Sequence, residues 1–153
     1  MVESLEESKR RGQKDIPSLG KIKKISYACQ WKDQFGYPLN EIQVADYYIE
    51  YEFGGNKSVF WLIEACKSHL HQNLKQLETS AIFFKRKNIS VDGYLIVIDE
   101  LIKNDKNRYS LKESTSKPLR ELEERTGYQN KFPRLIYKKP VFVIFRDDFK
   151  RLK

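Results

Sequence analysis

The chain has 153 residues, of which 40% are hydrophobic and 33% charged, with 7 glycines and 5 prolines. This length and composition suit one globular domain with a hydrophobic core, and they exclude a mainly disordered protein. The net charge of +8 favours a polyanionic partner such as nucleic acid, and the alternative is a charge that only keeps the protein in solution.

The first 33 residues are expected to hold one charged segment and one helix. Residues 1–15 are poor in apolar side chains, which predicts a flexible basic arm or a frayed helix. Their charged character leads us to expect no secretory signal there, and no apolar run in the chain reaches the roughly 20 residues that cross a bilayer. We therefore expect a cytoplasmic protein without a membrane partner. Residues 19–33 predict a helix that ends before Gly36. Its apolar side chains at helical spacing are Ile22, Ile25, Ala28 and Cys29.

Residues 44–53 and 58–66 give the clearest structural pattern in the chain. Both segments read as strands, and the segment GGNK between them is typical of a tight turn, so we predict an antiparallel hairpin. The second segment is apolar on both faces, which predicts a central position in a sheet.

The remaining elements complete a mixed sheet. A helix is expected over 68–87, a strand over 91–98, a polar loop over 104–116, a short helix over 118–125, and one or two strands over 135–145. The strand, helix, strand crossover makes its two strands parallel. The predicted fold is an α/β (α+β) domain with a central mixed β-sheet flanked by helices.

Acidic residues concentrate in the predicted hairpin. Residues 41–64 contain five acids and one base, a net charge of −4, whereas the rest of the chain carries 28 bases and 16 acids, a net of +12. A divalent-cation site needs hard carboxylate ligands, and a nucleic-acid substrate needs a basic rim. Asp46 and Glu64 lie on the two hairpin strands and would be held over the same end of the sheet. The alternative is that these acids only line a solvated face.

Two segments, ADYYIEYE (45–52) and LIEACKS (62–68), resemble the PD-(D/E)XK nuclease superfamily. That superfamily includes restriction endonucleases, recombination exonucleases and Holliday-junction resolvases, and its core order is helix, hairpin, helix, strand. The resemblance implies a restriction-endonuclease-like core over about 19–98 of a single domain (16–153), with a variable part over 99–153. It also implies a metal-dependent endonuclease that hydrolyses phosphodiester bonds, more readily of DNA than of RNA.

The same resemblance assigns residues to the site. Asp46 and Glu64 would bind Mg²⁺ (or Mn²⁺), with the backbone carbonyl of Ala65 as a third ligand. The family places Lys two positions after the second acid, but Cys66 stands there, and Lys67 follows one residue late. Strict alternation points Lys67 away from Glu64, unless a bulge or the end of the strand brings it into the catalytic site. Otherwise Cys66 lies in the site and the lysine role is vacant or filled from elsewhere.

Basic residues elsewhere are candidates for nucleic-acid contacts, and the C-terminal ones are interleaved with aromatic residues. They are Lys85, Arg86, Lys87, Lys131, Arg134, Lys138, Lys139, Arg146 and Arg151. The alternative is a solvated basic face over core aromatics. His69 and His71 are expected on a helix surface, and the alternative is that they contact phosphate or act as an acid near the metal. Cutting both strands of a duplex would need a homodimer or a partner subunit.

A second hypothesis is a non-catalytic nucleic-acid-binding or assembly protein that binds through the basic C-terminal segment.

Overall fold

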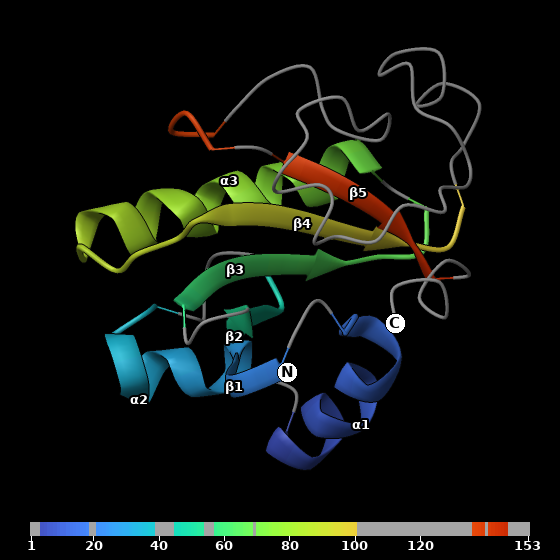
Figure 1. The fold of residues 1–153 in the computed structure, drawn as a ribbon, viewed down its shortest axis with the longest axis horizontal. Helices are drawn as coiled ribbons and strands as arrows, with labels where there is room; N and C mark the ends of the chain where they lie inside the picture. Colours follow the sequence, from blue (N-terminus) through green and yellow to red (C-terminus); the bar gives the residue numbers. More distant parts are fainter. Residues whose placement is uncertain are drawn as a thin grey trace.

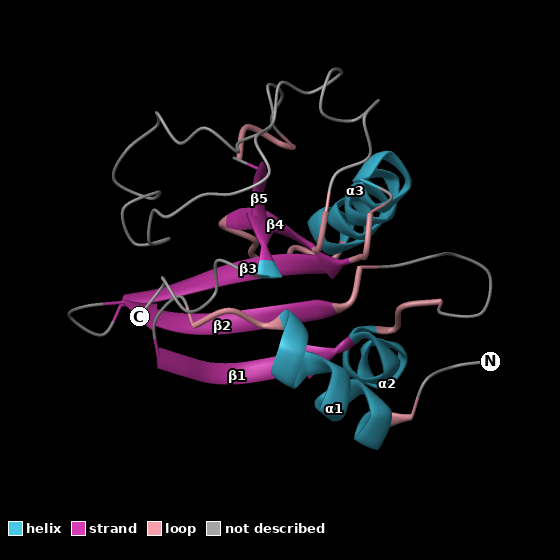
Figure 2. Cartoon of the chain, turned by 90° about the vertical axis from the view of Figure 1, so that its right-hand side faces the viewer, coloured by secondary structure: helices cyan, strands magenta, loops and turns pink. Residues whose placement is uncertain are grey.

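A five-stranded mixed sheet with the strand order β1-β2-β3-β4-β5 forms the centre of the described structure (Figures 1 and 2). The structure is a computed structural model that describes residues 4–18, 21–38, 45–53, 57–68, 70–100, 136–139 and 141–146. Its elements are α1 (Leu5–Asp15), β1 (Lys21–Tyr27), the 3₁₀ helix η1 (Ala28–Gln30), α2 (Trp31–Phe35), β2 (Tyr47–Phe53), β3 (Lys57–Ala65), α3 (Leu70–Arg86), β4 (Gly93–Ile98) and β5 (Val141–Phe145).

The expected hairpin and crossover are both present. β2 pairs antiparallel with β3 in a regular register from Tyr47 opposite Ile63 to Phe53 opposite Lys57. β4 then pairs parallel with β3 on its other side, and β5 pairs parallel with β4. β3 is therefore the central strand, as its apolar residues on both faces predicted. The predicted mixed sheet flanked by helices is confirmed.

The helix predicted over residues 19–33 is wrong, because residues 21–27 form β1 and pair antiparallel with β2. The register shifts between Ile22 and Lys24, and this irregularity hides the strict alternation that marks a strand. Ile25 and Tyr27 pack against the sheet, whereas Ile22 is 37% exposed. The exposed lysines of β1 are typical of an edge strand, where they discourage pairing with another chain. Within the described part of the segment predicted as a helix, helical structure begins at residue 28.

α3 covers one face of β3 and β4 (Figure 1). Its buried side chains recur at the predicted i, i+4, i+7 spacing and pack with the side chains of the sheet on that face. They are Leu70, Leu74, Leu77, Ala81 and Phe84. Residues on the opposite face of the sheet form a second buried cluster around Ile49, Trp61 and Ile63. β4 and β5 are thus buried along their whole length, between the two clusters.

Residues 5–15 form helix α1, so of the two expectations for the N-terminal segment, a flexible arm or a helix, the helix is present. It begins with a capping box, in which Ser4 and Glu7 each bond the other's backbone N–H. It contacts β1 and η1, and a Cβ atom added at Gly12 would lie 3.3 Å from Tyr27. This close approach brings the last turn of α1 to one end of the sheet (Figure 2).

Two of the predicted elements, the loop over 104–116 and the helix over 118–125, lie outside the described residues. The strand predicted around Pro140 is present as β5, preceded by a short bridge between Ile136 and Lys139. Among the helices that the structure describes, none combines the length and apolar character required to span a membrane.

Candidate functional site

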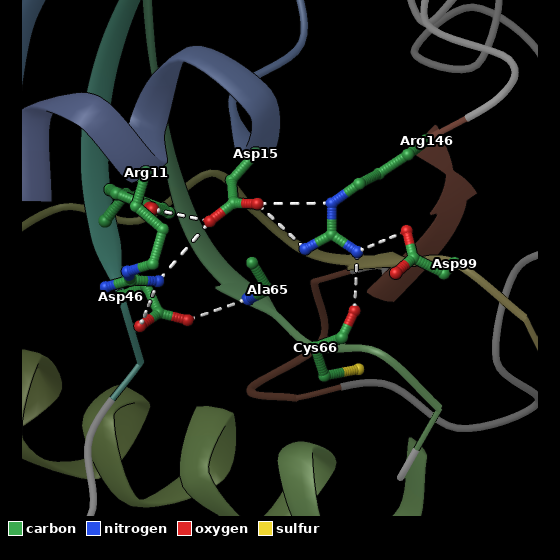
Figure 3. Close-up of polar contacts among 8 residues, drawn as sticks. Arg11, Asp15, Asp46, Ala65, Cys66, Asp99 and Arg146 are labelled. Carbon is green, nitrogen blue, oxygen red and sulfur yellow. Dashed lines mark hydrogen bonds and ion pairs between the residues drawn. The ribbon is translucent and has the colours of Figure 1, made fainter.

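The carboxyl ends of β3, β4 and β5 meet at one edge of the sheet, because these strands run parallel, and antiparallel β2 begins at the same edge. Asp46 lies directly before β2 (Figure 3). Its backbone N–H donates to the carbonyl of Ile63 at 2.9 Å, and its Oδ2 accepts the backbone N–H of Ala65 at 2.9 Å. These two hydrogen bonds hold the carboxylate of Asp46 against the end of β3.

Glu64 is the next residue of β3 after Ile63, and only 2% of its surface is exposed. Burial raises the pKa of Glu64 well above its ordinary value, and the charge of Asp46 and a hydrogen bond to Asp46 raise it further. Glu64 Oε2 has no hydrogen-bond partner among the described residues. Two adjacent carboxylates in a buried setting are unfavourable when both are ionised, and either a shared proton or a bound cation relieves that repulsion.

Arg11 brings a positive charge from α1 to this carboxylate pair. Its Nη1 lies 3.2 Å from Asp46 Oδ1 and 3.3 Å from Asp15 Oδ2 (Figure 3). Its guanidinium also lies over the ring of Tyr47, 5.4 Å from the centroid. Arg11 therefore neutralises part of the charge of Asp46, whereas Glu64 is buried from solvent.

Arg146, directly after β5, ties the strand ends to α1. Its Nε and Nη2 donate to Asp15 Oδ1 at 3.1 and 2.8 Å, and its Nη1 donates to Asp99 Oδ1 at 2.8 Å and to the carbonyl of Cys66 at 2.7 Å. Asp15 is nearly buried, with 5% of its side chain exposed, and its Oδ2 also accepts the hydroxyl of Tyr47 at 2.7 Å. One guanidinium thus joins α1, β3, β4 and β5.

We call Asp15, Asp46, Glu64 and Asp99 the carboxylate cluster. Within the described residues, no three or more His, Cys, Asp or Glu side chains are grouped as a metal-binding set. Mg²⁺, however, is commonly held by one or two carboxylates together with waters and substrate phosphates. Each carboxylate oxygen has two lone pairs, so Asp46 keeps acceptor capacity beside its bonds to Arg11 and Ala65. Glu64 Oε2 has no hydrogen-bond partner among the described residues, so Asp46 and Glu64 are the two residues here that could supply carboxylate ligands to such a cation.

Cys66 and Lys67, the two residues at the family's lysine position, follow the end of β3 at Ala65. Cys66 donates its backbone N–H to the carbonyl of Val97 at 2.8 Å. Burial, then the charge of Glu64, raises the pKa of Cys66 to about 12, so its thiol stays protonated near neutral pH. The side chain of Lys67 is exposed, and its carbonyl accepts the backbone N–H of Asp99 at 3.1 Å. Asp46, Glu64 and Ala65 are thus brought together, and Lys67 contributes its backbone to the same edge.

The other basic candidates divide between two ends of the sheet. Arg146 lies in the carboxylate cluster, where its donors are directed to protein acceptors, in contrast to the expected phosphate contact. Five others lie at the opposite end, at the C-terminus of α3 and just before β5: Lys85, Arg86, Lys87, Lys138 and Lys139. Lys131, Arg134, Arg151 and His69 are outside the described residues, as is the side chain of His71.

Sequence reasoning missed Arg11, Asp15 and Asp99. Asp99 had a usable signal, because an acid directly after a buried parallel strand lies at the carboxyl edge of the sheet. Arg11 and Asp15 gave no signal within their charged segment. Comparisons of this chain with family models, with curated proteins and with solved structures find no match. Its function is therefore inferred from the geometry of the carboxylate cluster.

Proposed function

We propose that this chain is a metal-dependent nuclease, a phosphodiester hydrolase acting on nucleic acid and more readily on DNA than on RNA. The observation that carries the proposal is the Asp46–Glu64 pair, in which a nearly buried glutamate with an unpaired oxygen faces a second carboxylate at the end of a sheet. The order α2, β2–β3 hairpin, α3, β4 supports a restriction-endonuclease-like core, since the PD-(D/E)XK resemblance expects helix, hairpin, helix, strand.

In this proposal Asp46 and Glu64 hold Mg²⁺ or Mn²⁺, with the carbonyl of Ala65 as a further candidate ligand. The cation would polarise the phosphate and lower the pKa of an attacking water. The protein's own residues set the geometry. The backbone N–H of Ala65 orients Asp46, and burial shields the carboxyl of Glu64 from bulk water. Arg11, already 3.2 Å from Asp46, is a donor that can contact a phosphate oxygen at the same place.

A second candidate function, a non-catalytic nucleic-acid-binding or assembly protein, is supported by a different observation. Arg11 and Arg146 ion-pair with Asp15, Asp46 and Asp99, so three of the four acids already have a cationic partner. In that case the cluster serves to fasten α1 to the sheet, and the basic residues alone bind the polymer.

Cleavage assays separate the two candidates. Purified protein is incubated with supercoiled plasmid, single-stranded DNA and RNA, each in Mg²⁺, Mn²⁺ or EDTA. Asp46→Asn and Glu64→Gln are compared with Glu52→Gln, a control that removes a charge from the same hairpin away from the cluster. The nuclease predicts metal-dependent cutting that both cluster variants lose and the control keeps. Cutting that survives in Asp46→Asn, or no cutting by a folded protein that shifts DNA in a gel, contradicts it. A homodimer or partner subunit would be required for duplex cleavage.

A further inference from the structure

A concavity of about 320 Å³ lies at the end of β4 opposite the carboxylate cluster. Its wall includes the last turn of α3, the segment that leads into β4, and the turn before β5. The polar and aromatic residues that define it are Lys85, Asn88, Asp92, Tyr94, Tyr137 and Lys139. Its volume is at the lower end of the range for small-molecule sites, roughly 300–1,000 Å³. Because a strand of this length spans roughly 20 Å, the concavity is separate from the cluster.

A tight turn presents Tyr137 to this concavity. Ile136 and Lys139 exchange backbone hydrogen bonds at 3.1 and 2.8 Å, and the two residues between them, Tyr137 and Lys138, have φ angles of 47° and 65°. Asn and Gly are preferred at such positions because side chains disfavour the left-handed conformation. Keeping a bulky Tyr there is a local strain of the kind found at ligand sites.

The side chains in the concavity combine positive charge with an aromatic face. Tyr137 is 46% exposed, and the Nζ of Lys85 lies 5.6 Å from the centre of its ring. Lys139 adds a second ammonium. Asp92 accepts the backbone N–H of Phe60 at 2.8 Å, so its carboxylate is tied into the protein. Burial, then the proximity of Tyr137, raises the pKa of Tyr94 to about 12, which leaves its hydroxyl a donor at neutral pH.

We propose that this concavity binds a nucleotide unit, with its base stacked on Tyr137 and its phosphate held by Lys85 and Lys139. Ammonium groups recognise phosphate, and an aromatic side chain stacks on a base of any sequence. The shared chemistry is a planar base joined to a phosphate, supplied either by a free nucleotide or by a single strand. The site does not depend on hydrolysis at the carboxylate cluster.

Titration of the ¹⁵N-labelled full chain in EDTA tests the proposal. The probes are deoxyadenosine monophosphate, deoxyadenosine, inorganic phosphate and a three-residue deoxyadenosine strand. The monophosphate is expected to shift the amide signals of the concavity and to bind about tenfold more tightly than either fragment alone. Tighter binding of the strand identifies a polymer as the source, and equal binding identifies a free nucleotide. Inorganic phosphate binding as tightly as the monophosphate, or signals that do not move at millimolar ligand, would overturn the site.

Variants give the matched controls. Tyr137→Leu should weaken monophosphate binding about tenfold and Lys85→Gln about fivefold. Tyr137→Phe retains the ring and should bind as the unaltered chain does, which keeps the test valid if Tyr137→Leu fails to fold. Lys87→Gln removes the same charge from the same helix end, but Lys87 lies over Phe83, 5.7 Å from the ring centroid, and should have no effect. An equal loss in Lys87→Gln contradicts a site in this concavity.

Discussion

Replacing Arg146 by Gln removes the guanidinium that joins α1 to the ends of β3 and β4. Four hydrogen bonds from Arg146 are lost, two to Asp15, one to Asp99 and one to the carbonyl of Cys66. Most of the lost stability comes from Asp15. Only 5% of its side chain is exposed, so water cannot solvate its charge once the guanidinium is gone.

The size of the expected loss of stability depends on the partners that Asp15 retains in the variant. Removing one partner of a buried ion pair costs about 3–5 kcal/mol. Asp15 retains the Tyr47 hydroxyl at 2.7 Å and Arg11 at 3.3 Å, and 22% of the Arg146 side chain is exposed. The lower limit of about 3 kcal/mol therefore applies. At about 2–4 °C per kcal/mol for a chain of this size, Tm should fall by roughly 6–12 °C.

Urea unfolding followed by tryptophan fluorescence measures this loss, since both Trp31 and Trp61 are buried. Arg10→Gln is the matched control, because Arg10 is an exposed residue of α1. The double variant with Asp15→Asn should lose less than the sum of the two single losses, because both changes break the same contact. A loss for Arg146→Gln within about 0.5 kcal/mol of the Arg10→Gln value would show that Arg146 does not stabilise the buried carboxylate of Asp15.

Three further predictions concern β4 and the end of β3. Gly93→Ala places a Cβ atom 2.9 Å from the buried ring of Trp61, and the resulting overpacking should cost about 1–3 kcal/mol in the same urea assay; an unchanged midpoint would show that the ring yields. Because the folded-state pKa of Glu64 is raised above its ordinary 4.5, the unaltered chain should lose stability relative to Glu64→Gln as pH rises from 4.5 toward the folded-state value. Unfolding at pH 5 and pH 8 checks this, and a difference independent of pH is the contrary result. With its pKa raised to about 12, the Cys66 thiol should resist iodoacetamide at pH 8 in the folded chain, and rapid alkylation of its peptide in mass spectra would oppose this.

The sheet was predictable where local patterns and tertiary structure agree. The turn segment and alternating strands specified the β2–β3 hairpin, and an apolar run on both faces specified β3 as central. β1 was not predictable in this way, because its irregular register places Ile22 and Ile25 at a spacing that also fits a helix. Pairing with β2, which is a tertiary contact, determines the outcome.

Only part of the carboxylate cluster was predictable from the sequence, namely the residues that lie on one hairpin. Asp46 and Glu64 belong to one hairpin, so their proximity follows from the pairing of its strands. The rest of the cluster joins distant segments, and the hydrogen bond between Arg146 and Asp15 spans 131 positions. No spacing rule relates such residues, since the tertiary fold alone brings α1 beside the end of β5.

Mn²⁺ binding to the purified chain, measured by electron paramagnetic resonance, shows whether Asp46 and Glu64 hold a metal ion. We expect one Mn²⁺ site per chain, for which Mg²⁺ competes. This site should be lost in Asp46→Asn and Glu64→Gln and persist in Glu52→Gln. No binding at millimolar Mn²⁺, or binding that Asp46→Asn leaves unchanged, would contradict the assignment of a metal to this pair of carboxylates.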